Sequence, residues 1–280
     1  MKKFIKTAGI NVWKILWAPL LFFGMQNFVF LVYAFFAMLP EILKIVFQTL
    51  LSGEEAAFVT EEELTETLMG TLNLHIPVII SACMTFLVIF LILKREWAAE
   101  AFWSLKKVKA APVFLCVLLG IALNFFISGV FTLLPIPEQE QPFEILLGGN
   151  LVLMLFSMAL ISPFLEEVIF RGIVQKRLIK MMNIHAAIIL QAALFGFIHL
   201  NWLQSSYSFI IGIVIGAAYF WHGSIWVPAV IHVVFNGTSV VLSHYAGGVE
   251  INGLIYIIIT AAALAVSALC MAELFRRRKV

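Results

Sequence analysis

The sequence GLIYIIITAAALAVSALCMAEL occupies residues 253–274, and its one charged residue, Glu273, stands next to its end. A helix needs about 20 apolar residues to cross the roughly 30 Å hydrocarbon core of a bilayer. This run meets that length without a Pro or a charge in its interior. It therefore predicts a transmembrane helix.

Similar apolar runs recur along the whole chain. The protein is 62% hydrophobic and 12% charged, whereas soluble domains are about 45–50% apolar and about 25% charged. We therefore predict an all-α, polytopic membrane protein in which residues 1–280 form a single integral membrane domain. About eight spans are expected, the fifth and sixth of them short: 13–39, 73–93, 112–134, 146–170, 184–200, 206–222, 225–245 and 253–274.

The basic residues predict how these helices are oriented. Lys and Arg collect on the cytoplasmic side of membrane proteins. With eight helices and the N-terminus inside, every Lys and Arg except Lys44 falls in an inner segment, and the Glu-rich stretches around 54–66 and 138–144 fall outside. Both termini are thus expected in the cytoplasm. The inner segments hold Lys2, Lys3, Lys6 and Lys14; Lys94, Arg95, Lys106, Lys107 and Lys109; Arg171, Lys176, Arg177 and Lys180; and Arg276, Arg277, Arg278 and Lys279.

These charges report topology, so they do not indicate binding to nucleic acid. The loops are compact and all acidic residues are Glu, with no Asp in the chain. These features look bacterial. The expected location is a bacterial cytoplasmic membrane, with the lipid bilayer as the main surrounding partner.

A few polar residues interrupt the apolar runs, and such residues inside a membrane are functional candidates. Glu166 and Glu167 stand in SPFLEEVIFRG, His199 ends LFGFIHL, and His232 and Asn236 lie in VPAVIHVVFNG. On a helix, His232 and Asn236 share one face because they are four residues apart.

Glu167 and Arg171 are also four residues apart, in the favourable order for a helical ion pair. Adjacent Glu166 then points about 100° away. One glutamate can be held by the arginine while the other faces a cavity.

The depth of these residues predicts where they meet. At about 1.5 Å per residue, His232 lies roughly 12 Å from the inner face, Glu166 about 15 Å, Asn236 roughly 18 Å and His199 roughly 22 Å. All four are expected in the inner half of the bilayer, with His199 fitting least well. A substrate is therefore expected to reach them from the cytoplasm.

This set of groups suits hydrolysis of an amide. A carboxylate in an apolar pocket is a usable general base for water, and a histidine beside it can hold the same water. A second histidine and an amide can donate hydrogen bonds to a developing oxyanion. No Ser or Cys nucleophile stands beside a histidine, so direct attack by activated water is the economical mechanism.

Three motifs in order resemble one known family. They are Glu-Glu-x-x-x-Arg at 166–171, Phe-x-x-x-His at 195–199 and His-x-x-x-Asn at 232–236. They are similar to those of the CPBP (CAAX protease and bacteriocin-processing, or Abi) family of intramembrane endopeptidases, which includes the eukaryotic CAAX prenyl endopeptidase. The resemblance covers about 155–240, the expected catalytic core.

The resemblance implies a role for each motif residue. Glu166 would activate the catalytic water with help from His199, and His232 and Asn236 would stabilise the oxyanion. Glu167 and Arg171 would support them. The substrate would be a peptide bond of a lipidated or membrane-associated peptide or protein.

The resemblance leaves metal dependence open. The family has long been labelled metalloprotease, and Glu166, His199 and His232 together could bind zinc with an open position. Against this, the sequence has no H-E-x-x-H pattern and Asn is a poor zinc ligand. A site without a cofactor is favoured, with zinc as the alternative.

Two other functions fit the same residues. A non-catalytic immunity or peptide-binding membrane protein would use the cavity without cutting. A proton-coupled transporter would relay protons through the glutamate and histidines, but such proteins often contain inverted repeats, and none is visible here.

Overall fold

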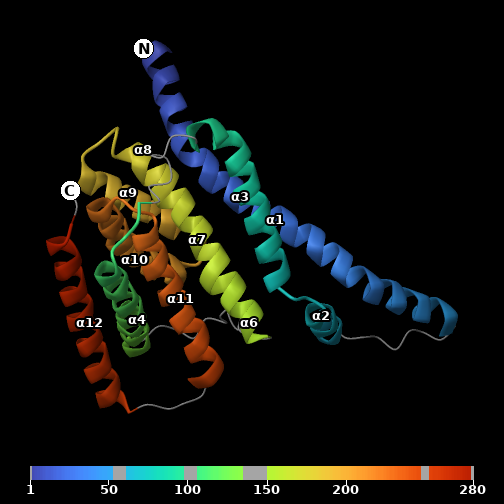
Figure 1. The fold of residues 1–280 in the computed structure, drawn as a ribbon. Coiled ribbons are helices and arrows are strands. Elements are labelled where there is room, and N and C mark those ends of the chain that lie inside the picture. The colour runs from blue at the N-terminus through green and yellow to red at the C-terminus, as the bar shows by residue number, and fades with distance from the viewer. Residues whose placement is uncertain (1, 53–60, 98–105, 135–149, 247–251, 279–280) are drawn as a thin grey trace.

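The fold is a bundle of helices, shown by a computed structural model that describes residues 2–52, 61–97, 106–134, 150–246 and 252–278 (Figure 1). Every regular element within these ranges is a helix. The elements are α1 (Lys2–Ser52), α2 (Glu61–Gly70), α3 (His75–Trp97), α4 (Ala110–Leu133), α6 (Leu151–Met154), η1 (Leu155–Ile161), α7 (Ser162–Glu167), η2 (Val168–Gln175), α8 (Lys176–Leu178), α9 (Ile184–Phe197), α10 (Trp202–His222), α11 (Trp226–Ala246) and α12 (Gly253–Arg276).

The prediction of an all-α, polytopic membrane protein is confirmed. Within the described ranges, seven helices are long and apolar enough to cross a membrane. The expected fifth span is shorter than predicted, because α9 has 14 residues and is therefore about 21 Å long. The chain leaves the helix there in a turn in which Leu200 has a positive φ of 54°.

Asn201 then starts α10 by accepting a hydrogen bond from the backbone N–H of Gln204 at 3.0 Å. This N-cap begins α10 four residues earlier than the expected sixth span, and so gives that span its full length. Of the two expected spans that were short, only α9 is short in the structure.

The fourth span corrects a second expectation. The chain is helical from Leu151 to Leu178 through α6, η1, α7, η2 and α8, and we call this stretch the fourth helix. Arg171 was expected in an inner loop, but it lies within this helix and is fully buried. The loop assignment was wrong because the buried carboxylate of Glu167 is its partner.

The bundle has two apolar cores. The first joins α1 and α3 to the fourth helix and α9, with Phe22, Ile89 and Phe170 among its members. The second joins α4, α10, α11 and α12. The two halves meet where the fourth helix packs on α11 and α9 packs on α10.

Many large apolar side chains point outward, especially on α1, α3 and α12. This is the surface expected of helices that contact lipid. The part of α1 from Val12 to Leu51 is the least buried of the candidate spans.

Figure 1 shows the start of α1, the short α8 and the end of α12 at one end of the bundle. We call it the basic end because it carries, among others, Lys14, Lys176, Arg177 and Arg276. The start of α6, the end of α11 and the start of α12 lie at the opposite end. Of the Glu-rich outer stretches, residues 54–60 and 138–144 lie outside the described residues.

Candidate functional site

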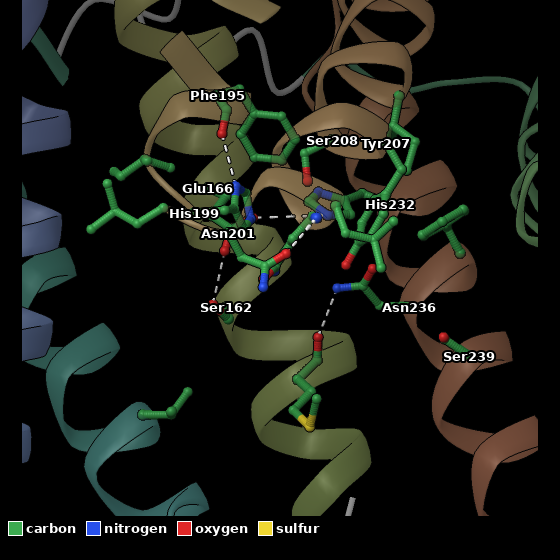
Figure 2. Close-up of a pocket in the computed structure, with 18 of the residues that line it drawn as sticks. Ser162, Glu166, Phe195, His199, Asn201, Tyr207, Ser208, His232, Asn236 and Ser239 are labelled. Atoms are coloured by element: carbon green, nitrogen blue, oxygen red, sulfur yellow. Dashed lines mark hydrogen bonds and ion pairs between the residues drawn. The ribbon is translucent and has the colours of Figure 1, made fainter. Parts of the chain in front are cut away.

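A cavity of about 870 Å³ lies between the two halves of the bundle. Its walls come from both halves, since Phe22 and Phe195 belong to the first core and Ile211 and Phe235 to the second. Four of the residues singled out from the sequence line this cavity together: Glu166, His199, His232 and Asn236 (Figure 2). Helices far apart in the sequence thus bring these side chains to one place.

The two adjacent glutamates of α7 have different surroundings. Glu166 lines the cavity, is 9% exposed, and accepts a hydrogen bond from Ser162 Oγ to its Oε1 at 3.0 Å. Glu167 is fully buried behind the cavity wall. The helix is of the π type on both sides of α7, in η1 and η2, and such wider turns often occur at functional sites.

Glu167 is the centre of a buried polar network. Its Oε1 accepts a hydrogen bond from Arg171 Nη1 at 3.0 Å, so the ion pair that the spacing predicts is present. The same oxygen lies 2.7 Å from His232 Nδ1. The network therefore fixes the histidine ring from behind and leaves Nε2 on the cavity side, 3.8 Å from Glu166 Oε2.

The ring of Phe195 holds the two histidines and the arginine in place. His199 and His232 each meet it edge-to-face, with centroid distances of 5.2 and 5.6 Å. Arg171 Cζ lies 4.8 Å from the ring centroid, close enough for a cation–π contact. His199 Nδ1 is 2.9 Å from the backbone oxygen of Phe195, an acceptor that fixes a proton on Nδ1 and leaves Nε2 as the second ring nitrogen.

Two asparagines join neighbouring helices at the cavity. Asn236 Nδ2 donates to the backbone oxygen of Met158 at 3.0 Å, which ties α11 to η1. Asn124 Nδ2 donates to the backbone oxygen of Phe235 at 3.1 Å, which ties α4 to α11. These bonds fix the height of His232 and Asn236 relative to Glu166.

The sequence did not single out several of these partners. Ser162 stands four residues before Glu166, so helical spacing alone could have found it. Phe195 was noticed only as the first residue of a motif. Asn124 and Met158 act through contacts between helices, and no spacing in the sequence signals those.

The expected zinc ligands do not form a metal cluster. Among the described residues, no group of three or more His, Cys, Asp or Glu side chains is placed to hold a metal ion. Glu166, His199 and His232 share the cavity, but they do not converge as a ligand set. The donor set does not fit a three-ligand zinc site.

The arrangement can activate and position water. One carboxylate faces a cavity in an apolar bundle, with one oxygen bonded to a hydroxyl and the other near an imidazole. An amide and a second imidazole stand close by. This is a set suited to general acid–base chemistry.

A comparison with known protein families found a match over the part of the chain that holds this site. The family model "Type II CAAX prenyl endopeptidase Rce1-like" matches residues 148–238, the segment that contains all three motifs and every residue of the network above. No curated protein and no solved structure was found to match the chain. The predicted resemblance is confirmed over residues 148–238, where this multi-pass membrane protein is similar to the Rce1-like type II CAAX prenyl endopeptidases.

Proposed function

We propose that this protein is an intramembrane endopeptidase in which Glu166 activates water against a peptide bond. The observation that carries the proposal is the setting of the Glu166 carboxylate. Ser162 fixes one of its oxygens, and the other faces His232 Nε2 at 3.8 Å inside the cavity. An approaching water has room to contact both groups.

The proposed reaction has two stages, which these positions support. Glu166 accepts a proton as the water oxygen attacks the carbonyl carbon, which forms a tetrahedral intermediate. The C–N bond then breaks, and the proton passes from Glu166 to the leaving nitrogen. Carboxylates in enclosed sites can act in this way as base and then as acid.

His232 and Asn236 are proposed to stabilise the negative oxygen of the intermediate. When both ring nitrogens of His232 carry protons, Nδ1 donates to Glu167 and Nε2 donates into the cavity. Asn236 uses its amide nitrogen for Met158, and that NH₂ group has a second hydrogen. Preorganised donors of this kind lower the barrier by a few kcal/mol each.

Glu167 and Arg171 are proposed as supporting residues and His199 as a second group that holds the water. Arg171 balances the charge of Glu167, which in turn keeps His232 oriented. The substrate is proposed to be a membrane-associated or lipidated peptide, and the membrane a bacterial cytoplasmic membrane.

The test replaces one oxygen of the general base. Glu166→Gln keeps the size and the hydrogen-bond acceptor for Ser162 but cannot take a proton, so we expect loss of cleavage with unchanged folding. The measurement is a proteomic comparison of membrane peptides from wild-type and Glu166→Gln cells, with thermal unfolding of both purified proteins. Glu41→Gln, on the outer part of α1, is the matched control and should cleave normally.

Cleavage retained by Glu166→Gln would overturn the mechanism. A phenotype that persists in this variant without any change in peptides would instead favour a binding protein. A metal requirement is tested separately, because a glutamate mechanism predicts activity in strong chelators and no stoichiometric zinc in the purified protein.

A further inference from the structure

The cavity opens toward one end of the bundle, as the exposure of its lining residues on two helices indicates. Along α11, the cavity-lining residues change from buried at His232 to half-buried at Asn236 and exposed at Ser239 and Ser243. Apart from the buried Val240, exposure along this wall thus increases away from the basic end.

The same change occurs on α4. Asn124 and Ile127 are buried, whereas Ser128 and Thr132, farther toward the end of the helix, are exposed. We call Ser128, Thr132, Ser239 and Ser243 the mouth. It lies toward the end of the bundle where α4 and α11 finish, opposite to the basic end.

The path from the site toward the basic end is closed. Arg171, Gln175 and Gln191 are fully buried there. Arg171 and Gln191 donate to the backbone oxygen of Gly212, at 3.4 and 2.7 Å, and Gln175 donates to that of Gly216 at 2.8 Å. These bonds join the fourth helix, α9 and α10 in one packed layer.

The walls of the cavity are almost without charge. Among the described residues that line it, Glu166 is the one carboxylate, and there is no Lys or Arg. α1 contributes three phenylalanines together with the uncharged polar residues Gln26 and Asn27, while the mouth presents hydroxyl groups. An uncharged, largely apolar peptide segment matches these walls, since a charged one would find no partner.

We infer that the substrate is an uncharged peptide segment that enters the cavity from the end opposite to the basic end. This inference rests on the proposed peptidase function. Because Lys and Arg mark the cytoplasmic side, that end faces away from the cytoplasm. The depth of the site residues favoured access from the cytoplasm, but depth does not say which way a cavity opens.

Cysteine accessibility tests the inference without needing activity. In a background with Cys83, Cys116 and Cys270 replaced by Ala, Ser208→Cys places a thiol deep in the cavity. Ile210→Cys is its matched control on the same helix, because that side chain is exposed but does not line the cavity. Lys180→Cys marks the basic end and Thr71→Cys the opposite end.

A membrane-impermeant thiol reagent is applied to intact cells and to inverted vesicles. We expect Ser208→Cys to react from the same side as Thr71→Cys and not from the side of Lys180→Cys. Ile210→Cys should react from neither side, since thiolate forms in water and not in lipid. Reaction of Ser208→Cys only from the Lys180 side, or from neither side, would overturn the inference.

The two proposals fail separately. If Ser208→Cys reacts from the basic end while Glu166→Gln abolishes cleavage, the peptidase stands and the direction of access is reversed. If Glu166→Gln still cleaves, the mechanism is lost whatever the accessibility pattern.

Discussion

Arg171 is a fully buried cation whose partners come from three different helices. It donates to Glu167 on the fourth helix and to the backbone of Gly212 on α10, and it lies over the ring of Phe195 on α9. A buried charge of this kind is tolerated only while its partner remains. Arg171 therefore supports both the packing of the bundle and the position of His232.

Replacing Arg171 should be costly for folding. Arg171→Met leaves Glu167 buried with His232 as its remaining partner, and breaking a buried ion pair typically costs about 3–5 kcal/mol. Thermal unfolding in detergent is the measurement. Arg276→Met, which removes an exposed ion pair with Glu273, is the control and should have little effect. Equal unfolding temperatures for the two variants would contradict the role of Arg171.

Ser162 should affect the rate more than the stability. Ser162→Ala removes the hydroxyl that fixes Glu166. If this raises the activation free energy by about 1.4 kcal/mol, kcat falls about tenfold. The measurement is steady-state cleavage of a substrate found by the proteomic comparison. Ser206→Ala on the exposed side of α10 is the control, and an unchanged kcat in Ser162→Ala would exclude the positioning role.

Spacing within one helix was predictable at the residue scale. The pairing of Glu167 with Arg171 and the common face of His232 and Asn236 both follow from four-residue separations. Contacts between helices could not be predicted from such separations, because they depend on which helices become neighbours. Phe195 shows this clearly, since its partners at 170, 171 and 232 lie on two other helices. The catalytic roles themselves stay predictions.

At the scale of elements, α9 and α10 approach closely because small residues face each other. A Cβ on Gly212 would lie 2.9 Å from Ala192 Cβ, and one on Gly216 would lie 2.5 Å from Gln191 Nε2. The G-x-x-x-G spacing of these residues is a known signature of tight packing between membrane helices. The close approach also lets the two glycine carbonyl groups accept hydrogen bonds from Gln191 and Gln175.

Adding a methyl group at this contact should separate the two helices. Gly212→Ala is expected to destabilise the protein by about 1–3 kcal/mol through overpacking, measured by thermal unfolding. Gly24→Ala on α1 is the matched control, because a Cβ there meets nothing within 4 Å. Alanine in an open helical position should stabilise by up to about 1 kcal/mol. A Gly212→Ala protein as stable as wild type would show that the contact can relax.

The existence of the helices was predictable and some of their limits were not. The length of the apolar runs predicted every span. The charged residues predicted an end of the fourth helix near residue 170, but the helix continues through Arg171 to Leu178. The π-type turns of η1 and η2 have no sequence signature of their own. They flank α7, the helix that carries Glu166, so the local geometry of the site required the structure.

For the whole molecule, the arrangement of the ends matches the alternation of charge. Figure 1 shows the start of α1 and the end of α12 at the basic end, as eight alternating passes require when α9 is counted as a short one. The cytoplasmic location of this end remains a prediction from the positive-inside rule.

Reporter fusions test that orientation. A fluorescent reporter that folds only in the cytoplasm, fused after residue 180 or at the C-terminus, should be bright, and fusions after residue 72 or 252 should be dark. A reporter that is active only outside the cytoplasm should give the opposite pattern. The same reporter signal from the fusions after residues 180 and 252 would contradict the predicted alternation of helix direction, because these positions lie at opposite ends of the bundle.

The short α9 also determines where water can reside. The chain turns through Leu200 about 21 Å along α9, and the residues of the turn bond back to the last carbonyl groups of the helix, as His199 does to Gly196 and Leu200 to Phe197. Non-helical backbone at such depth is tolerated where it lines a water-filled space, and His199, Leu200 and Asn201 line the cavity. We therefore expect the cavity beside this turn to hold water, so that the reactant for the proposed hydrolysis would stand near Glu166 before any peptide arrives.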